Sequence, residues 1–128
     1  MRTALAAAVL ALCAGTPALA TGGFECRPVS GTGPTLVMTV GHTASASVVG
    51  ATLIDGERRF STGGERPALA VGQSWIDGRY LWLDLTDANL TRHEAKLRAE
   101  FQPKLRGRPA IGTLTWGGRS WRVRCTEG

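Results

Sequence analysis

Three glycine-containing pairs separate segments in which hydrophobic and polar residues alternate, and this pattern constrains the fold more than any other feature. The pairs are Asp55-Gly56, Asp77-Gly78 and Gly117-Gly118. Glycine adopts the positive φ that tight hairpin turns require, and aspartate tolerates it better than most residues. Each pair therefore predicts a β-hairpin, and the chain as a whole indicates antiparallel strands joined by short turns.

The segments that follow two of these turns alternate as half-buried strands do. After the second pair, three leucines share one face: Leu81, Leu83 and Leu85. The other face of that segment carries Tyr80, Trp82 and Asp84. After the third pair, the face that we expect to point into the core carries Trp121, Val123 and Cys125. Its opposite face carries Ser120, Arg122 and Arg124.

Residues 94–102 are compatible with two structures. They are good helix formers, and Leu97 and Phe101 also fit a helical stripe. Apolar and polar residues nevertheless alternate without exception from Ala95 to Gln102, which favours a strand. We therefore predict an all-β fold, a small antiparallel barrel or sandwich of seven to eight strands, with one short helix as the alternative for this segment.

Residues 1–20 have the parts of a secretory signal peptide, namely a basic residue, an apolar run over 4–14 and a small-residue cleavage site at 18–20. The run is shorter than the roughly 20 residues that a membrane-spanning helix needs. No later apolar run approaches that length. We expect cleavage after Ala20, a periplasmic or secreted location, and a single β domain over residues 21–128.

Three cysteines occur in the chain, and the first, Cys13, falls inside the signal peptide. Lipidation of Cys13 is disfavoured because the residue before it, Leu12, is large. The remaining two, Cys26 and Cys125, lie near the two ends of the predicted domain. An even number of cysteines in an oxidising compartment predicts one disulfide, which would join the first strand to the last. A metal pair or two free thiols are the alternatives.

No group of residues has the spacing of a catalytic motif. We expect His42 to lie in a turn or on the surface and His93 to be solvated. Asp84, Asp87 and Asn89 lack the spacing and the glycine of a calcium-binding EF-hand loop. We therefore expect no catalytic residue, metal or cofactor. The one route to an enzyme, a small hydrolase, is a carboxylate pair that the fold brings together.

The charge is distributed unevenly along the chain. Residues 92–125 contain nine Lys or Arg and two acidic residues, whereas residues 21–91 contain five Arg and seven acidic residues. The basic part includes the predicted last hairpin with Trp116. Guanidinium groups beside aromatic rings bind anions through paired hydrogen bonds and stacking. This pattern favours an anionic ligand such as lipopolysaccharide or nucleic acid, and the alternative is a solvated, arginine-rich surface.

Two features of the chain match the pattern of a known family. The first is an aromatic residue two positions before a cysteine, in Phe24-Glu25-Cys26, with Cys125 as the second cysteine. The second is an Asp-Gly step inside an aromatic segment, residues 75–82. In them the chain resembles the periplasmic inhibitors of c-type lysozyme. The resemblance implies a secreted barrel that inhibits lysozyme. The serine and lysine that such a protein would insert into the lysozyme cleft fall at Val71-Gly72 and near Asp84 and are not matched.

Together these observations predict a monomeric, non-enzymatic binding module in the periplasm or outside the cell. Its partner would be a macromolecule or an anionic surface. The candidate binding residues are Arg119, Arg122, Arg124, Trp116, Tyr80, Trp82, Asp77 and Gly78. Two alternatives are inhibition of a cell-wall hydrolase by the Asp77-Gly78 hairpin and binding of anionic ligands by the last hairpin.

Overall fold

A computed structural model describes residues 22–42 and 46–128, except for the side chain of His42, and every regular element within them is a β-strand. These residues therefore include no helix that could cross a membrane. The predicted signal peptide, with Cys13 and the cleavage position after Ala20, lies outside them. The strands are β1 (Gly22–Pro28), β2 (Thr35–His42), β3 (Ala46–Asp55), β4 (Arg58–Ser61), β5 (Leu69–Ile76), β6 (Tyr80–Asp87), β7 (His93–Phe101), β8 (Ala110–Trp116) and β9 (Arg119–Glu127).

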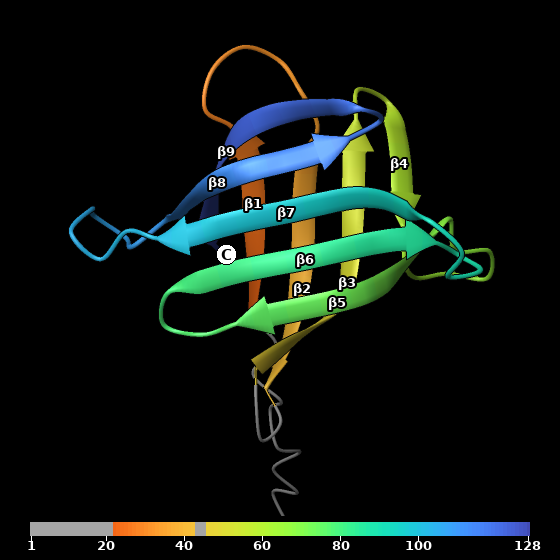
Figure 1. Cartoon of the computed structure of the whole chain (residues 1–128), viewed down its shortest axis with the longest axis horizontal. Helices are drawn as coiled ribbons and strands as arrows, with labels where there is room; N and C mark the ends of the chain where they lie inside the picture. Colours follow the sequence, from red (N-terminus) through yellow and green to blue (C-terminus); the bar gives the residue numbers. More distant parts are fainter. Residues whose placement is uncertain (1–21, 43–45) are drawn as a thin grey trace, which may run out of the picture.

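The strands form one antiparallel sheet in the order β4-β3-β2-β1-β9-β8-β7-β6-β5. In Figure 1, β5 to β8 cross in front of β1 to β4, and β9 curves from one group to the other. The two edges of the sheet approach each other, and the N–H of Ala68 donates to the carbonyl of Ser61 over 3.0 Å. The sheet is thus a nearly closed barrel.

The barrel confirms the predicted all-β class, but it contains nine strands where the sequence predicted seven to eight. The shortest strand is β4, which has four residues and begins with two exposed arginines. It is the second arm of the hairpin that the Asp55-Gly56 pair predicted.

The core is formed by the inward residues of all the long strands. The leucines that β6 was predicted to bury are all at most 1% exposed, as are the largest buried side chains from the other strands. These others are Leu36, Met38, Leu53, Leu97, Leu114 and Val123. The predicted inward face of β9 is confirmed, although Trp121 is only partly buried.

The ambiguous segment 94–102 forms most of β7 and is a strand, as predicted. Its alternate residues Ala95, Leu97 and Ala99 are buried in the core. Its backbone pairs on both sides, with β6 and with β8. Pairing on two sides outweighs the helix propensity of the segment, because propensity is a weak preference that tertiary contacts override.

Cys26 and Cys125 form the predicted disulfide. The two residues are direct partners in the register of β1 with β9, and neither is exposed to solvent. The bond joins positions that are 99 residues apart in the sequence. It therefore fixes the one contact of the sheet that brings the first strand against the last.

The three predicted turns differ in how closely they follow the sequence pattern. Gly117 and Gly118 both have positive φ, of 58° and 75°, and form the expected two-residue turn. In the first hairpin, Asp55 pairs with Arg58, so the turn is shifted by one residue. In the second, Ile76 pairs with Leu81 and the N–H of Asp77 donates to the carbonyl of Tyr80 over 3.1 Å, so the turn is also shifted by one residue, and Gly78 does not adopt positive φ. There the Asp77 side chain shapes the loop.

Candidate binding site

Two exposed tryptophans face outward from the barrel on neighbouring strands. Trp75 on β5 and Trp82 on β6 are direct partners in the strand register. Trp75 is 57% exposed and Trp82 is 39% exposed. Large aromatic side chains that remain accessible next to each other on a folded domain are typical of contact surfaces. We therefore take this pair as the centre of the candidate site.

The orientation of Trp75 is fixed by the loop that follows β5. Its indole nitrogen donates to Asp77 Oδ2 over 2.8 Å. The other carboxylate oxygen of Asp77 accepts hydrogen bonds from the N–H groups of Arg79 (2.7 Å) and Tyr80 (2.6 Å). These donors, the Tyr80 N–H foremost, lower the pKa of Asp77 below its ordinary value. Asp77 thus links an exposed tryptophan to a preorganised hairpin loop.

Trp82 is held between two neighbours on the outer face. The guanidinium carbon of Arg98 lies 5.4 Å from the centre of the Trp82 ring, in a cation–π contact. The ring of Tyr80, two residues earlier on β6, lies 5.0 Å from the Trp82 ring and is tilted by 41°. Both contacts leave part of the indole accessible, so the ring is positioned in advance of any ligand.

The most unusual residue of the outer face is Asp84, which is buried there and not in the core. Arg98 Nη2 lies 2.8 Å from Asp84 Oδ1, but the direction of the N–H does not make this ion pair a hydrogen bond. Gly72, at a bulge in β5, lies against Asp84, since a Cβ at Gly72 would be 3.5 Å from that of Asp84. Among the described residues, no group donates a hydrogen bond to Asp84 Oδ1.

A hollow of about 360 Å³ lies beside Asp84, whose Oδ1 is itself not accessible from it. Its lining combines two aromatic rings, an ion pair, an amide and a hydroxyl, contributed by Gln73, Ser74, Trp75, Trp82, Asp84 and Arg98. Arg98 is fixed there by a hydrogen bond from Nη1 to the carbonyl of Leu97 (2.8 Å). Such a hollow can hold a group that has an apolar surface and a hydrogen-bond donor.

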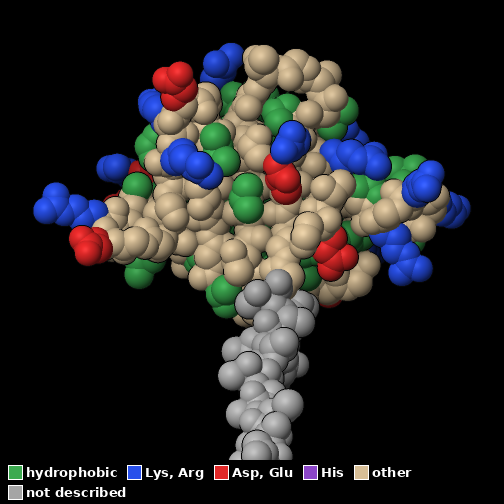
Figure 2. All heavy atoms as spheres, turned by 180° about the vertical axis from the view of Figure 1, so that it is seen from behind, with side chains coloured by type: hydrophobic (Ala, Val, Ile, Leu, Met, Phe, Trp, Pro, Cys, Tyr) green, Lys and Arg blue, Asp and Glu red, His purple; other side chains and the backbone are tan. Residues whose placement is uncertain are grey.

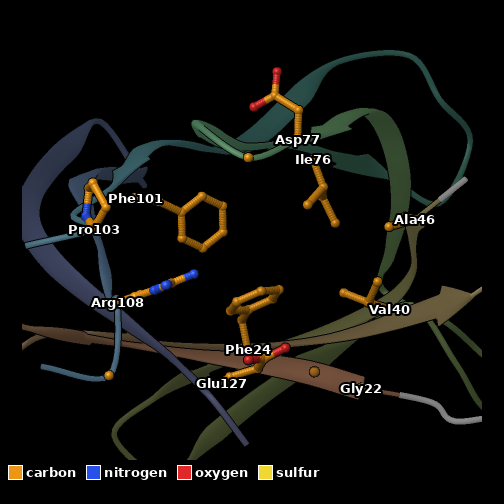
Figure 3. Close-up of a pocket in the computed structure, with 13 residues that line it drawn as sticks. Gly22, Phe24, Val40, Ala46, Ile76, Asp77, Phe101, Pro103, Arg108 and Glu127 are labelled. Carbon is orange, nitrogen blue, oxygen red and sulfur yellow. The ribbon is translucent and has the colours of Figure 1, made fainter.

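A larger and more apolar hollow, of about 600 Å³, lies at one end of the barrel. Figure 3 shows Phe24, Phe101 and Ile76 pointing into it, whereas the carboxylate of Asp77 points away. The two phenyl rings are 5.8 Å apart. The predicted binding residues Asp77 and Gly78 therefore lie on the rim between this hollow and the tryptophan pair.

The structure separates the three predicted arginines of the last hairpin. Arg122 and Arg124 are exposed on the outer face of β9, where Arg124 lies opposite Arg27 of β1. Arg119 belongs to the other face of the strand, and its guanidinium lies 5.7 Å from the centre of the Trp121 ring. Figure 2, which shows the barrel from behind, has Lys and Arg side chains both on this face and at its edge, with Asp and Glu side chains among them.

The predicted site residue Trp116 is not part of an accessible platform. Its ring packs on Phe60 with 5.1 Å between the ring centres, and its indole nitrogen donates to Asp55 Oδ2 over 3.4 Å. Trp116 is partly buried and packs against the core. It therefore helps close the β3–β4 edge of the barrel over the last hairpin.

The other polar residues considered from the sequence have no role in this site. His93 is exposed at the start of β7, and the side chain of His42 lies outside the described residues. The Asp87 carboxylate accepts hydrogen bonds from Thr91 and from the N–H of Arg92, and thereby closes the loop after β6. Among the described residues, no three His, Cys, Asp or Glu side chains come together as a metal site would need.

Five residues that line the hollow were not among the predicted ones, namely Gln73, Ser74, Trp75, Asp84 and Arg98. The alternation of β6 already placed Asp84 on the same face as Tyr80 and Trp82. Nothing in the sequence indicates that an outward aspartate is buried, because its cover comes from β5 and its ion-pair partner from β7.

Comparisons with protein-family models, with curated proteins and with solved structures find no match to this chain. The function is therefore argued from the geometry of the site.

Proposed function

We propose that the protein is a non-enzymatic binding module, active in the periplasm or outside the cell, that binds its ligand on the outer face of β5, β6 and β7. The observation that carries this proposal is the buried Asp84 carboxylate beside the exposed pair Trp75 and Trp82. The Asp84 charge is compensated by Arg98 at 2.8 Å, so the hollow beside the rings combines an acceptor, an amide and a hydroxyl without excess charge. A ligand that covers the rings can also form hydrogen bonds to these polar side chains. The partner thus presents an apolar surface with a donor beside it.

The test measures cosedimentation of the purified protein with three separate envelope preparations: peptidoglycan sacculi, lipopolysaccharide vesicles and membrane vesicles. We expect binding to one of them, weakened about tenfold or more by Trp75→Ala or Trp82→Ala, as for the central aromatic residues of an interface. Val49→Ala is the control, because Val49 is exposed on β3, outside the site. Binding that neither tryptophan variant weakens, or no binding to any preparation, contradicts the proposal.

A second candidate function is inhibition of a cell-wall hydrolase, and the geometry of one loop favours it. Residues 77–79 are exposed, and the Asp77 side chain holds their backbone through two hydrogen bonds. A loop that is already ordered loses little entropy when it enters a cleft. The test is the lysis rate of c-type lysozyme with excess protein. This function is supported if the wild-type protein slows lysis and the Asp77→Ala variant does not. A lysis rate that the wild-type protein leaves unchanged excludes it.

Binding of anionic ligands is a third candidate, which the β1–β9 pair favours. Arg27 and Arg124 are direct partners, and like charges in that position repel unless an anion or an acidic side chain compensates them. Glu25 does so for Arg27, with 2.8 Å between Oε1 and Nε. We expect the double variant Arg122→Ala/Arg124→Ala to elute from heparin at lower salt than wild type. Arg119→Ala is the matched control on the other face, and equal elution of all three proteins contradicts this function.

A further inference from the structure

We infer that the hollow beside Asp84 is a saccharide site, which takes one neutral pyranose ring of a glycan chain. This inference rests on the proposed binding face and specifies its ligand. The C–H face of the sugar ring stacks on the exposed indoles of Trp75 and Trp82. One of its hydroxyl groups donates a hydrogen bond to the Asp84 carboxylate where it lines the hollow, away from Oδ1, which faces Arg98.

The indole rings of Trp75 and Trp82 form an aromatic wall of the hollow, and this wall favours a ligand ring that is apolar on its face and polar at its edge. The face of an indole carries negative electrostatic potential, and the C–H groups on one side of a pyranose carry partial positive charge. Trp75 and Trp82 are held by Asp77 and Arg98, so their stacking on a sugar costs little conformational entropy. A purely apolar ligand would fill the same wall but would leave the carboxylate without a donor.

The charges around Asp84 favour a neutral ligand. A carboxylate only accepts hydrogen bonds, so its partner must be a donor. A cation would meet the guanidinium of Arg98, which lies 2.8 Å from Asp84 Oδ1, and Lys96 is the register partner of Asp84 on β7. An anion would be repelled by Asp84 itself. A sugar hydroxyl donates without adding charge, and this leaves the ion pair intact.

The size and remaining lining of the hollow fit one ring of a longer chain. Its volume of about 360 Å³ is near the lower end for ligand sites. Gln73 and Ser74 line it as well and supply an amide and a hydroxyl for further hydroxyl groups of the sugar. Because Trp75 remains 57% exposed, neighbouring sugar units can extend past it over the surface. We therefore assign the site to a glycan and expect monosaccharides to bind more weakly.

The experiment is a titration of the 15N-labelled protein, residues 21–128, followed by NMR at the indole N–H groups. The neutral probes are chitotetraose (N-acetylated), cellotetraose and maltotetraose, with their monomers. Tetragalacturonate is the anionic probe. We expect at least one neutral tetrasaccharide to shift the Trp75 and Trp82 signals saturably and to bind more tightly than its monomer. Tetragalacturonate should bind at least tenfold more weakly.

Two variants test the assigned contacts. Asp84→Asn, which removes the charge from the acceptor, should weaken binding about tenfold or more, the loss expected for a hydrogen bond to a charged group. Asp55→Asn is its matched control at an exposed ion pair outside the site and should bind like wild type. Trp75→Ala, at an exposed position, tests the stacking even if Asp84→Asn does not fold.

Three results would overturn the inference. The first is that no neutral tetrasaccharide shifts either indole signal. The others are that tetragalacturonate binds as tightly as the neutral tetrasaccharides, or that a folded Asp84→Asn variant binds as tightly as wild type. If no saccharide binds but binding to an envelope preparation still depends on Trp75 and Trp82, the saccharide site is rejected and the proposed binding face is retained. If no binding depends on these tryptophans, both the saccharide site and the proposed function fail.

Discussion

Asp84 and Arg98 form an ion pair on the outer face of the barrel, with 2.8 Å between Asp84 Oδ1 and Arg98 Nη2. The two side chains differ greatly in exposure, since that of Asp84 is 7% exposed and that of Arg98 is 37% exposed. The buried carboxylate thus depends on a partly solvated cation for its charge compensation. This asymmetry determines how the two residues respond to substitution.

Arg98→Leu should lower the free energy of unfolding more than Asp84→Leu does. The arginine variant leaves a buried carboxylate without its partner, whereas the aspartate variant leaves a guanidinium that can reach water. We expect a loss of about 2 kcal/mol for Arg98→Leu, below the range for fully buried pairs because Arg98 is partly exposed. Urea denaturation measures it. Arg58→Leu, at an exposed ion pair, serves as control and should cost under about 1 kcal/mol. Equal losses at positions 84 and 98 would contradict this account.

The loop held by Asp77 should open in acid. The N–H of Tyr80, the indole of Trp75 and the N–H of Arg79 lower the pKa of Asp77 in the folded protein. The stabilisation is therefore present above the ordinary aspartate pKa and is lost as the pH falls through the lowered value. An NMR titration should show the Trp75 indole signal moving in that lower pH range.

Two variants identify the group responsible for this acid transition. In Asp77→Asn the Trp75 indole signal should no longer follow the same titration. Asp87→Asn, which removes a second aspartate with a lowered pKa in a different loop, should leave it unchanged. A Trp75 signal that titrates alike in all three proteins would show that another group controls the loop.

Removal of the disulfide should destabilise the barrel without abolishing its strands. Cys26 and Cys125 are 99 residues apart, and the chain-entropy estimate for a loop of that length is about 4–5 kcal/mol. The double variant Cys26→Ala/Cys125→Ala should lose roughly this amount in urea denaturation and retain its β-type circular dichroism. A loss below about 1 kcal/mol would mean that the β1–β9 pairing does not need the covalent bond.

Gly112 is the glycine at which a side chain should be tolerated least. A Cβ there would lie 1.9 Å from the carbonyl oxygen of Arg98 and 2.5 Å from the Cα of Ala99, both in the backbone of β7. Gly112→Ala must push β8 away from β7, at a cost of about 2 kcal/mol or more. Gly78→Ala is the control, because Gly78 has open space and no positive φ. Thermal unfolding compares them, and a Gly112→Ala midpoint equal to that of the control contradicts the close approach.

The parts of the fold that depend on local patterns could be predicted. The leucines of β6 point inward because side chains alternate along any strand, and Gly117-Gly118 turns because only glycine adopts positive φ so readily. The same reasoning placed Tyr80 and Trp82 on an exposed face. It did not identify the one-residue shift of the Asp55 turn, which depends on the register of β3 with β4.

The candidate site was predicted only in part, because it is assembled from three strands. Trp75, Trp82 and Arg98 are consecutive partners across β5, β6 and β7, although 23 residues separate the first from the last. Their alignment depends on the register of two strand pairs. Arg119 is separated from Arg122 and Arg124 by the alternation of side chains along β9, although one hairpin carries all three.

By itself, the sequence determined the β class, most of the hairpins, the inward face of each well-patterned strand and the pairing of Cys26 with Cys125. These follow from interactions between residues close in the chain and from the count of cysteines. Only the tertiary structure decided that the sheet closes into a barrel and that Asp84 is buried on its outer face. Register and bulges arise from pairing between distant segments, and a shift of one residue would turn every side chain of a strand to the opposite face.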